Sequence, residues 1–354
     1  MIDFNDAQAL RAADPGESLD RVYHLPEQIE EAMELATKSG VQIDVPRVDT
    51  LVVTGLGGSA IGGDLLRVYA ADQAKVPIVV NRGYTLPGFV DEKTLVFVTS
   101  YSGDTEETLA AYEEAKQRKA QIVCITSGGE LAKRAKAAGD GLVEVPQGYP
   151  PRTATGYLLF PAILLLDTAA LITGGGADVR DVLSVLRAMR ERYAPENPVE
   201  NNLAKQIAQS FVDRLPVIWG ASGTTEAVAM RWKTQINENA KAPAYWNLFS
   251  ELNHNEINGF QGPADVLQKM QIVILRTGFD HPRIHKRMSI SADLIKDQVA
   301  GVQIVEGEGE TALGQAFSLL YLGDFASLYL ALAYGIDPTP VPIISQLKQA
   351  LAEG

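Results

Sequence analysis

The sequence predicts an α/β protein built from two doubly wound domains, each with a parallel sheet. A length of 354 residues is enough for two domains that each bury their own core. Apolar, β-branched runs alternate with helix-like segments, a pattern typical of parallel sheets covered by helices on both faces. A second series starts at Leu215, where PVIWGASGTTEAVAMRWKTQI parallels the earlier LVVTGLGGSAIGGDLLRVYA. We therefore expect a degenerate duplication of one doubly wound unit.

The first series of apolar runs predicts a sheet of five strands. We expect these strands at residues 51–54, 77–81, 95–100, 121–126 and 142–145, with helices at 60–70, 106–118, 130–138 and 157–172. Residues 20–37 also have helical apolar spacing and precede this sheet. Residues 180–192 resemble a long connecting helix that leads to the second series.

The second series predicts four strands and a long apolar helix. We expect the strands to begin near residue 215 and to continue at 244–246, 271–275 and 301–305, with the helix at 312–334. Its first turn, GASGTTE, is poor in glycine and includes Glu226, so we expect it to keep the fold without a phosphate site. The predicted division is a helical lead-in (1–45), a first domain (46–178), a linker helix (179–200) and a second domain (201–354).

The composition excludes several classes of protein. A net charge of −13 argues against a general nucleic-acid binder. The single cysteine, Cys124, excludes an internal disulfide and a cysteine-based metal cluster, and it fits a reducing cytoplasm. No signal peptide is visible at the N-terminus. The apolar stretch at 157–171 is interrupted by Pro161 and Asp167, so we expect a buried helix there and not a membrane span.

Two polar loops of the first half predict a phosphate site. The segments TGLGGSAIGGDLL (54–66) and TSYSGDTEETL (99–109) each follow a strand-like run and open a helix. Such a junction binds anions, because unpaired N–H groups and the positive end of the helix dipole point at the same place. Hydroxyl groups add donors without adding charge. The candidate ligands of a phosphorylated small molecule are Gly58, Ser59, Ser100, Ser102 and Thr105.

Neither loop fits the common nucleotide motifs. The first loop lacks the Gly-Lys-Ser/Thr ending of a P-loop. Where a dinucleotide-binding domain has an acidic residue after its second strand, this chain has Asn81. The alternative is that the glycines only make a tight turn between strand and helix.

Candidate acid–base residues lie in the second half, in the segment NENAKAPAYWNLFSELNHNEINGF (237–260). Glu238 and His254 form a carboxylate–imidazole combination that recurs in proton transfer. The alternative is that the Asn and Glu residues cap helices and that His254 is a surface residue. NHNE lacks the HExxH spacing of a metal site, and we expect His281 and His285 to lie on a solvated basic surface.

Arg152, in PPRTATGYL, follows the last expected strand of the first domain, where open α/β sheets place ligand groups. It is a candidate cation for a phosphate or a developing oxyanion. The alternative is an exposed loop arginine.

The combination of GGSAIGGD, SYSGDTEET, PRTATGY, INENAK, NHNE and a C-terminal LK resembles the bifunctional phosphoglucose/phosphomannose isomerase family, within the sugar isomerase (SIS) domain superfamily. The resemblance implies two flavodoxin-like SIS domains and an enzyme that interconverts glucose 6-phosphate, fructose 6-phosphate and mannose 6-phosphate through an enediolate. It implies no metal and no redox cofactor. It also implies a cytoplasmic homodimer with shared active sites, a sugar phosphate as the partner, and neither nucleic acid nor membrane.

The resemblance also implies a role for each candidate residue. Ser59, Ser100, Ser102 and Thr105 would hold the sugar phosphate, with Gly58 offering its N–H. Glu238 would be the base, Arg152 would stabilise the enediolate, Lys348 would reach the site from the C-terminal helix, and His254 would assist ring opening from the partner subunit.

Two alternatives stay open. A sugar-phosphate sensor without catalytic activity could use the same loops, although it would need neither Glu238 nor His254. An isomerase of another sugar phosphate, such as an amino sugar, would also fit the phosphate loops.

Overall fold

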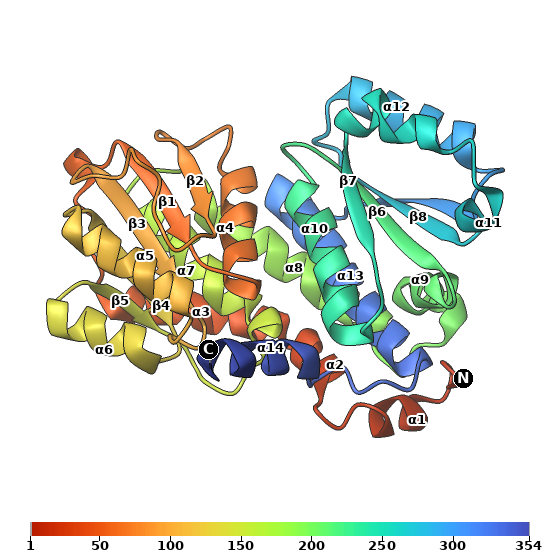
Figure 1. Cartoon of the computed structure of the whole chain (residues 1–354), viewed down its shortest axis with the longest axis horizontal. Helices are drawn as coiled ribbons and strands as arrows, with labels where there is room; N and C mark the ends of the chain where they lie inside the picture. The colour runs from red at the N-terminus through yellow and green to blue at the C-terminus, as the bar shows by residue number, and fades with distance from the viewer. Residues whose placement is uncertain (1, 354) are drawn as a thin grey trace. The chain divides into compact units, whose positions relative to one another are not determined.

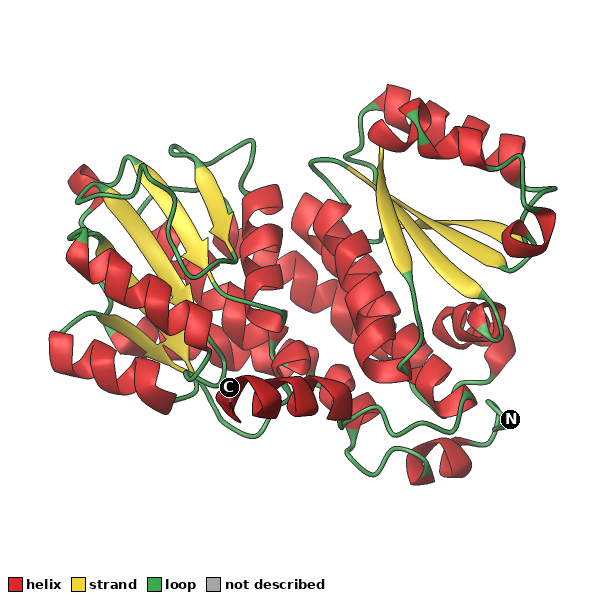
Figure 2. Cartoon of the chain, viewed as in Figure 1, coloured by secondary structure: helices red, strands yellow, loops and turns green. Residues whose placement is uncertain are grey.

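The computed structural model describes residues 2–353 and divides into two compact units (Figure 1). The first-sheet unit consists of His24–Arg187 and Glu308–Ala316. The second-sheet unit consists of Ala188–Gly307 together with the described residues before 24 and after 316. Each unit contains one parallel sheet flanked by helices (Figure 2), as the sequence predicts.

The first sheet has the five predicted strands, in the order β2-β1-β3-β4-β5. Val53 of β1 pairs with Val80 of β2 on one side and with Phe97 of β3 on the other. The strands are β1 (Thr50–Thr54), β2 (Ile78–Asn81), β3 (Thr94–Thr99), β4 (Gln121–Thr126) and β5 (Gly141–Glu144). β1 and β3 lie in the interior of the sheet, which explains why they are almost continuously apolar.

Helices cover both faces of this sheet. α5 (Glu106–Gln117) and α6 (Gly129–Ala138) lie over one face (Figure 1), where their alanines pack on Val96, Val98 and Cys124. α4 (Gly58–Tyr69) lies on the opposite face, where Gly63 packs closely against Val53. α7 (Thr155–Thr168) packs against α4 and against α3 (Leu25–Ser39), and almost all of its residues are buried.

The second sheet repeats this topology with four strands, in the order β7-β6-β8-β9. In both sheets the first strand of the series lies between the second and the third, so the predicted duplication is confirmed at the level of topology. The strands are β6 (Leu215–Ala221), β7 (Tyr245–Phe249), β8 (Met270–Arg276) and β9 (Gly301–Glu306). Their helices are α9 (Leu203–Phe211), α10 (Glu226–Gln235), α11 (Ala264–Leu267) and α12 (Pro282–Ile295). Trp219 anchors the core, edge-on to Phe249 and Phe260.

The lead-in predicted for residues 1–45 is divided between the two units. α1 (Ala7–Ala12) and α2 (Ser18–Tyr23) belong to the second-sheet unit, where Tyr321 donates a hydrogen bond to the carbonyl of Tyr23. α3 belongs to the first-sheet unit, because the buried Gln28 side chain bonds the carbonyl of Thr153 and the N–H of Gly156. Two of the unit boundaries fall within helices: one within α8 (Gly175–Tyr193), in the region expected to be a linker, and one within α13 (Ala312–Ala333).

Among residues 2–353, α13 alone is long and apolar enough to cross a membrane by length and composition. However, 94% of its most apolar 18-residue window is buried inside the protein, as expected of a core helix. The last helix, α14 (Pro342–Glu353), is exposed and includes Lys348.

Candidate active site

The topology of the first sheet brings the two polar loops together. β1 lies between β2 and β3, so β1 and β3 are neighbours in the sheet. The chain continues from β1 toward one edge of the sheet and from β3 toward the other. This switch point is where open α/β sheets bind ligands, at the carboxyl ends of the strands. The loop after β1 (residues 55–57) and the loop after β3 (residues 100–105) both start there.

Glycines allow three backbone segments to approach one another at this edge. A Cβ atom at Gly55 would lie 2.7 Å from the carbonyl oxygen of Thr99, at the end of β3. A Cβ atom at Gly58 would lie 2.6 Å from the carbonyl oxygen of Pro151 and 3.1 Å from the nitrogen of Arg152. The first turn of α4 therefore rests directly on the short helix η2 (Pro151–Thr153), which carries Arg152.

Hydrogen bonds connect and shape the two loops. Ser59 Oγ accepts a bond from the N–H of Tyr101 at 3.3 Å, which joins the first loop to the second. Ser100 Oγ accepts a bond from the N–H of Gly103 at 3.1 Å and lies 3.0 Å from Thr105 Oγ1. Ser59 and Ser100 are buried, whereas Ser102 is exposed. The arrangement presents serine and threonine hydroxyls beside the N-termini of α4 and α5, neither of which has a side-chain cap.

Arg152 is only 5% exposed. The alternative of an exposed loop arginine is therefore wrong. The backbone nitrogen of Arg152 lies beside the first turn of α4, so a buried, positively charged residue follows directly on the segment that packs against this edge of the sheet.

Glu238 lies on the second-sheet unit, on η4 (Ile236–Ala240), which directly continues α10. η4 is a π-helical turn, a feature often found at functional sites. The Glu238 side chain is half-buried. It is thus held on a regular element and retains access to solvent.

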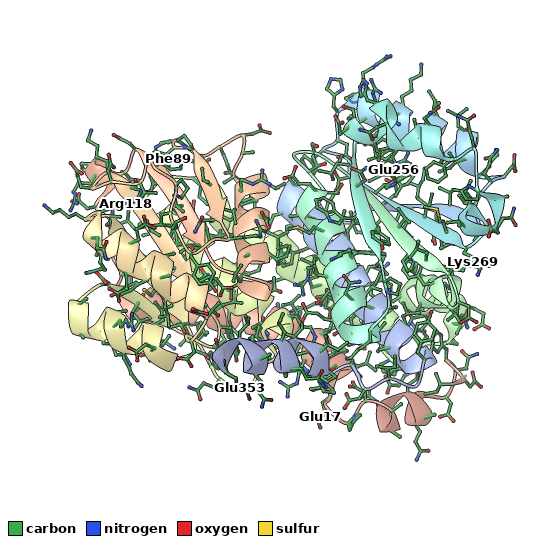
Figure 3. All side chains as sticks on the ribbon, viewed as in Figure 1. Glu17, Phe89, Arg118, Glu256, Lys269 and Glu353 are labelled. Atoms are coloured by element: carbon green, nitrogen blue, oxygen red, sulfur yellow. The ribbon has the colours of Figure 1, made fainter. Side chains whose placement is uncertain are left out.

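His254 is the exposed last residue of η5 (Glu251–His254), and its polar neighbours hold the loop in place. Asn253 Nδ2 donates to Ser291 Oγ at 2.8 Å, and Asn255 caps η6 (Glu256–Gly259). Glu256, labelled in Figure 3, accepts bonds from Trp219 Nε1 and from the amide of Asn247. Asn255 therefore caps a helix and His254 lies at the surface, as the alternative supposed, whereas Asn253 and Glu256 make structural bonds that are not helix caps.

The structure thus groups the predicted residues by unit. The first-sheet unit brings together Gly58, Ser59, Ser100, Ser102, Thr105 and Arg152. The second-sheet unit carries Glu238, His254 and Lys348 on three different elements, η4, η5 and α14. Sequence reasoning missed the buried ion pair between Arg231 of α10 and Asp324 of α13. The available signal was Asp324, the one charged residue of the otherwise apolar α13.

The loop after β6 differs from its counterpart after β1. Its Gly223 N–H is taken by the carboxylate of Glu226 at 2.9 Å, and the hydroxyl of Thr224 bonds the buried carboxylate of Asp280. Carboxylates of the chain itself thus occupy donors that a phosphate would otherwise use.

The two histidines four residues apart have separate structural contacts. His281 caps α12 by accepting a bond from the N–H of Arg283 at 3.1 Å. His285 Nε2 lies 2.7 Å from the carbonyl oxygen of Thr277. Across the part of the chain that is described, no group of three or more His, Cys, Asp or Glu residues could hold a metal ion.

Both halves of the chain match known protein families. Residues 47–140 match the SIS domain family, and residues 200–351 match the family described as the bacterial phospho-glucose isomerase C-terminal SIS domain. A bifunctional phosphoglucose/phosphomannose isomerase from Caldicellulosiruptor bescii is 49% identical over 94% of this chain and 98% of that protein. This chain belongs to the bifunctional phosphoglucose/phosphomannose isomerase family.

Other relatives of this isomerase family extend the comparison. The protein of the same name from Aquifex aeolicus is 35% identical over 85% of this chain and 90% of its own. A D-glucosamine-6-phosphate 4-epimerase from Sulfolobus acidocaldarius is 31% identical over 62% of this chain and 68% of its own. Among solved structures, a glucose-6-phosphate isomerase like protein from Thermus thermophilus shares the fold, with a TM-score of 0.61, 19% identity and coverage of 96% and 98% of the two chains.

Proposed function

We propose that this protein interconverts glucose 6-phosphate and fructose 6-phosphate, and also mannose 6-phosphate, through an enediolate intermediate. Membership of the phosphoglucose/phosphomannose isomerase family supports this activity. The observation that carries the proposal is the convergence of two hydroxyl-rich loops and a buried arginine at the switch point of the first sheet.

The sugar phosphate is held at its phosphate end. Hydroxyl groups donate hydrogen bonds to the phosphate oxygens from Ser59, Ser100, Ser102 and Thr105. The Gly58 N–H and the N-termini of α4 and α5 add partial positive charge that attracts the phosphate. Binding energy from this remote group positions the reacting carbons, which is how a non-reacting part of a substrate raises the rate of a chemical step.

Glu238 moves the proton. In the open-chain aldose its carboxylate removes the C2 proton, and the electron pair of that bond forms the C1–C2 double bond while negative charge develops on O1. Arg152 stabilises this charge. Return of the proton to C1, with the O2 proton transferred to O1, gives the ketose. Return to either face of C2 gives the glucose or the mannose epimer.

Proton NMR tests this function directly. Purified protein incubated with fructose 6-phosphate is expected to produce the anomeric signals of both glucose 6-phosphate and mannose 6-phosphate. Glu238→Gln should abolish both signals while isothermal titration calorimetry still detects binding, because a positioned base contributes about 10²–10⁴-fold to the rate. Binding without turnover in the unmodified protein would instead favour the sensor.

An amino-sugar phosphate is the second candidate substrate, favoured by the relative named as a glucosamine-6-phosphate epimerase. Glucosamine 6-phosphate is therefore included in the same NMR assay. Faster turnover of this substrate than of fructose 6-phosphate would replace the first assignment.

We further propose a homodimer in which His254 assists ring opening in the partner's site. His254 is exposed, on a loop held rigidly by Asn253 and Glu256. In a C2 dimer the exchange is reciprocal. Mixing inactive Glu238→Gln with inactive His254→Ala protein should restore up to about a quarter of wild-type activity, because about half of the dimers are mixed and each has one intact site. No restoration after verified subunit exchange would place the histidine in its own chain's site.

A cytoplasmic location completes the proposal. The single cysteine, Cys124, allows no internal disulfide, which fits a reducing compartment. Its thiol is buried in β4, and burial raises the pKa of the thiol, so it stays protonated.

A further inference from the structure

A row of buried polar side chains fixes η4, the turn that carries Glu238, to α13. Three members lie on α10 and η4, at every fourth residue, and two lie on α13. We call these five residues the polar row: Arg231, Gln235, Asn239, Asp324 and Ser327. Each is at most 3% exposed.

The first half of the polar row contains a bidentate ion pair, joined by two hydrogen bonds. Arg231 donates from Nε to Asp324 Oδ1 at 3.0 Å and from Nη2 to Asp324 Oδ2 at 2.7 Å. Gln235 Nε2 donates to Asp324 Oδ1 at 2.9 Å. Because two parallel bonds fix the relative direction of both groups, this pair sets the rotation of α10 on α13.

The second half of the polar row lies next to Glu238. Asn239 Nδ2 donates to Ser327 Oγ at 2.9 Å, and Ser327 Oγ donates its own proton to the carbonyl of Asp324 at 2.8 Å. The serine hydroxyl is therefore committed as a donor to its own helix, and its lone pairs accept from Asn239. The residue that follows Glu238 is thus held by a bond of defined direction.

The π turn explains why Asn239 reaches this partner. Four residues of an α-helix turn through about 400°, so Asn239 would lie about 80° around the helix from Arg231 if α10 continued unchanged. A π turn contains more residues per turn and reduces this drift. Asn239 and Ala240 are accordingly buried, whereas Asn237 and Glu238 are half-buried.

The far end of η4 is also fixed. Lys241 has a left-handed backbone, with φ of 54°, which ends the turn. Its ammonium group donates to the carbonyl oxygens of Asn239, Asp337 and Pro338 at 2.9–3.1 Å. The residues on either side of η4 are therefore both bonded: Gln235 to α13, and Lys241 to the segment that follows α13.

We propose that Asn239, acting through Ser327, is a positioning residue that sets the direction of the Glu238 carboxylate toward the substrate. This inference rests on the proposed function, in which Glu238 is the base. Asn239 itself is directed at α13, so its contribution is to the geometry of the proton transfer and not to its chemistry.

The test compares Asn239→Ala and Ser327→Ala with Thr234→Ala. Thr234 is a matched control, because its hydroxyl bonds the carbonyl of Arg231 on the same helix at 2.9 Å and its side chain is half-buried, outside the polar row. For fructose 6-phosphate we expect kcat, normalised to the folded fraction, to fall roughly 10–100-fold in the two test variants and less than about twofold in the control. KM should change less than about twofold, because the phosphate-binding residues belong to the first-sheet unit.

The double variant separates positioning from general loosening. Because Asn239 acts through Ser327, Asn239→Ala/Ser327→Ala should lose about as much kcat as either single variant. Multiplicative losses, or a kcat for Asn239→Ala equal to that of the control, would overturn the proposal. If Asn239→Ala does not fold, Ser327→Ala decides the question, since it removes a single oxygen atom.

Glu238→Gln, measured in the same series, tests the proposed base separately from the positioning role of Asn239. Wild-type turnover in this variant would refute the proposed base. An inactive Glu238→Gln together with fully active Asn239→Ala and Ser327→Ala would leave the base in place and refute the positioning role alone.

Discussion

A methyl group at Gly58 should displace Arg152 and weaken catalysis. The Cβ of Gly58→Ala would lie 2.6 Å from the carbonyl oxygen of Pro151 and 2.9 Å from its carbonyl carbon. Ordinary contact begins at 3.4 Å, so α4 and η2 must separate by about 0.8 Å. Both contacts are backbone atoms, which cannot rotate away as a flexible side chain does. The substitution should cost about 1–3 kcal/mol of stability, as other overpacked sites do.

The same displacement acts on the site, because the backbone of residue 58 and the backbone of Arg152 move apart. A misplacement near 1 Å costs up to about 10²-fold in rate, so we expect kcat/KM for fructose 6-phosphate to fall roughly 10–100-fold. Steady-state kinetics and urea unfolding measure the two effects separately.

Gly88→Ala is the matched control for Gly58→Ala. Gly88 lies in the same unit, has open space where a Cβ would point, and has no left-handed φ. Its replacement should leave kcat/KM unchanged and stability equal or slightly higher. If Gly58→Ala matched this control in both measurements, the close approach of α4 to η2 would not be a requirement of the site.

Three further perturbations test other parts of the structure. Ser102→Ala/Thr105→Ala should raise the Kd for fructose 6-phosphate in calorimetry by one to a few orders of magnitude, since each bond to a charged group contributes about 1.5–3 kcal/mol; unchanged affinity would mean that these hydroxyls only shape the loop. Asp324→Ala should lower the free energy of urea unfolding by roughly 3–5 kcal/mol, because it removes the carboxylate that forms an ion pair with the buried Arg231, and the double variant with Arg231→Met should be less destabilised. Burial lowers the pKa of Lys205 from 10.5 to about 8, so between these values the unfolded chain holds a proton that the folded chain has released. Wild-type stability should therefore rise with pH in that window relative to Lys205→Met, by at most about 1.4 kcal/mol per pH unit, and parallel urea-unfolding profiles would contradict this assignment.

Local pattern predicted the sheets well. The strand expected at 121–126 has the same bounds as β4, because a run of apolar, β-branched residues buried on both faces is bounded by polar turns. The polar loops could also be placed together, since the carboxyl ends of neighbouring parallel strands share one edge. Packing between distant segments could not be predicted: the contact of Gly58 with Pro151 joins residues far apart in the sequence.

The environment of Glu238 shows the same limit. INENAK indicated a functional segment, but the π turn depends on a partner helix 93 residues away, where Asp324 meets Arg231. The lead-in was divided for a similar reason. Lys205 donates to the carbonyl oxygens of Phe4, Pro195 and Asn197, each at 2.7 Å, and so attaches the N-terminal segment to the second-sheet unit. No periodicity in the first 45 residues reveals that attachment.

The carboxylates bonded in the loop after β6 determine how many sugar-phosphate molecules we expect one chain to bind. Glu226 and Asp280 accept hydrogen bonds from Gly223 and Thr224, which correspond to donors of the proposed phosphate site after β1, and their negative charge repels a second anion. A titration with fructose 6-phosphate should therefore saturate at one molecule per chain, although the chain contains the doubly wound architecture twice. The first copy of the doubly wound unit would then hold the proposed phosphate site, and the second copy would contribute the proposed base, Glu238.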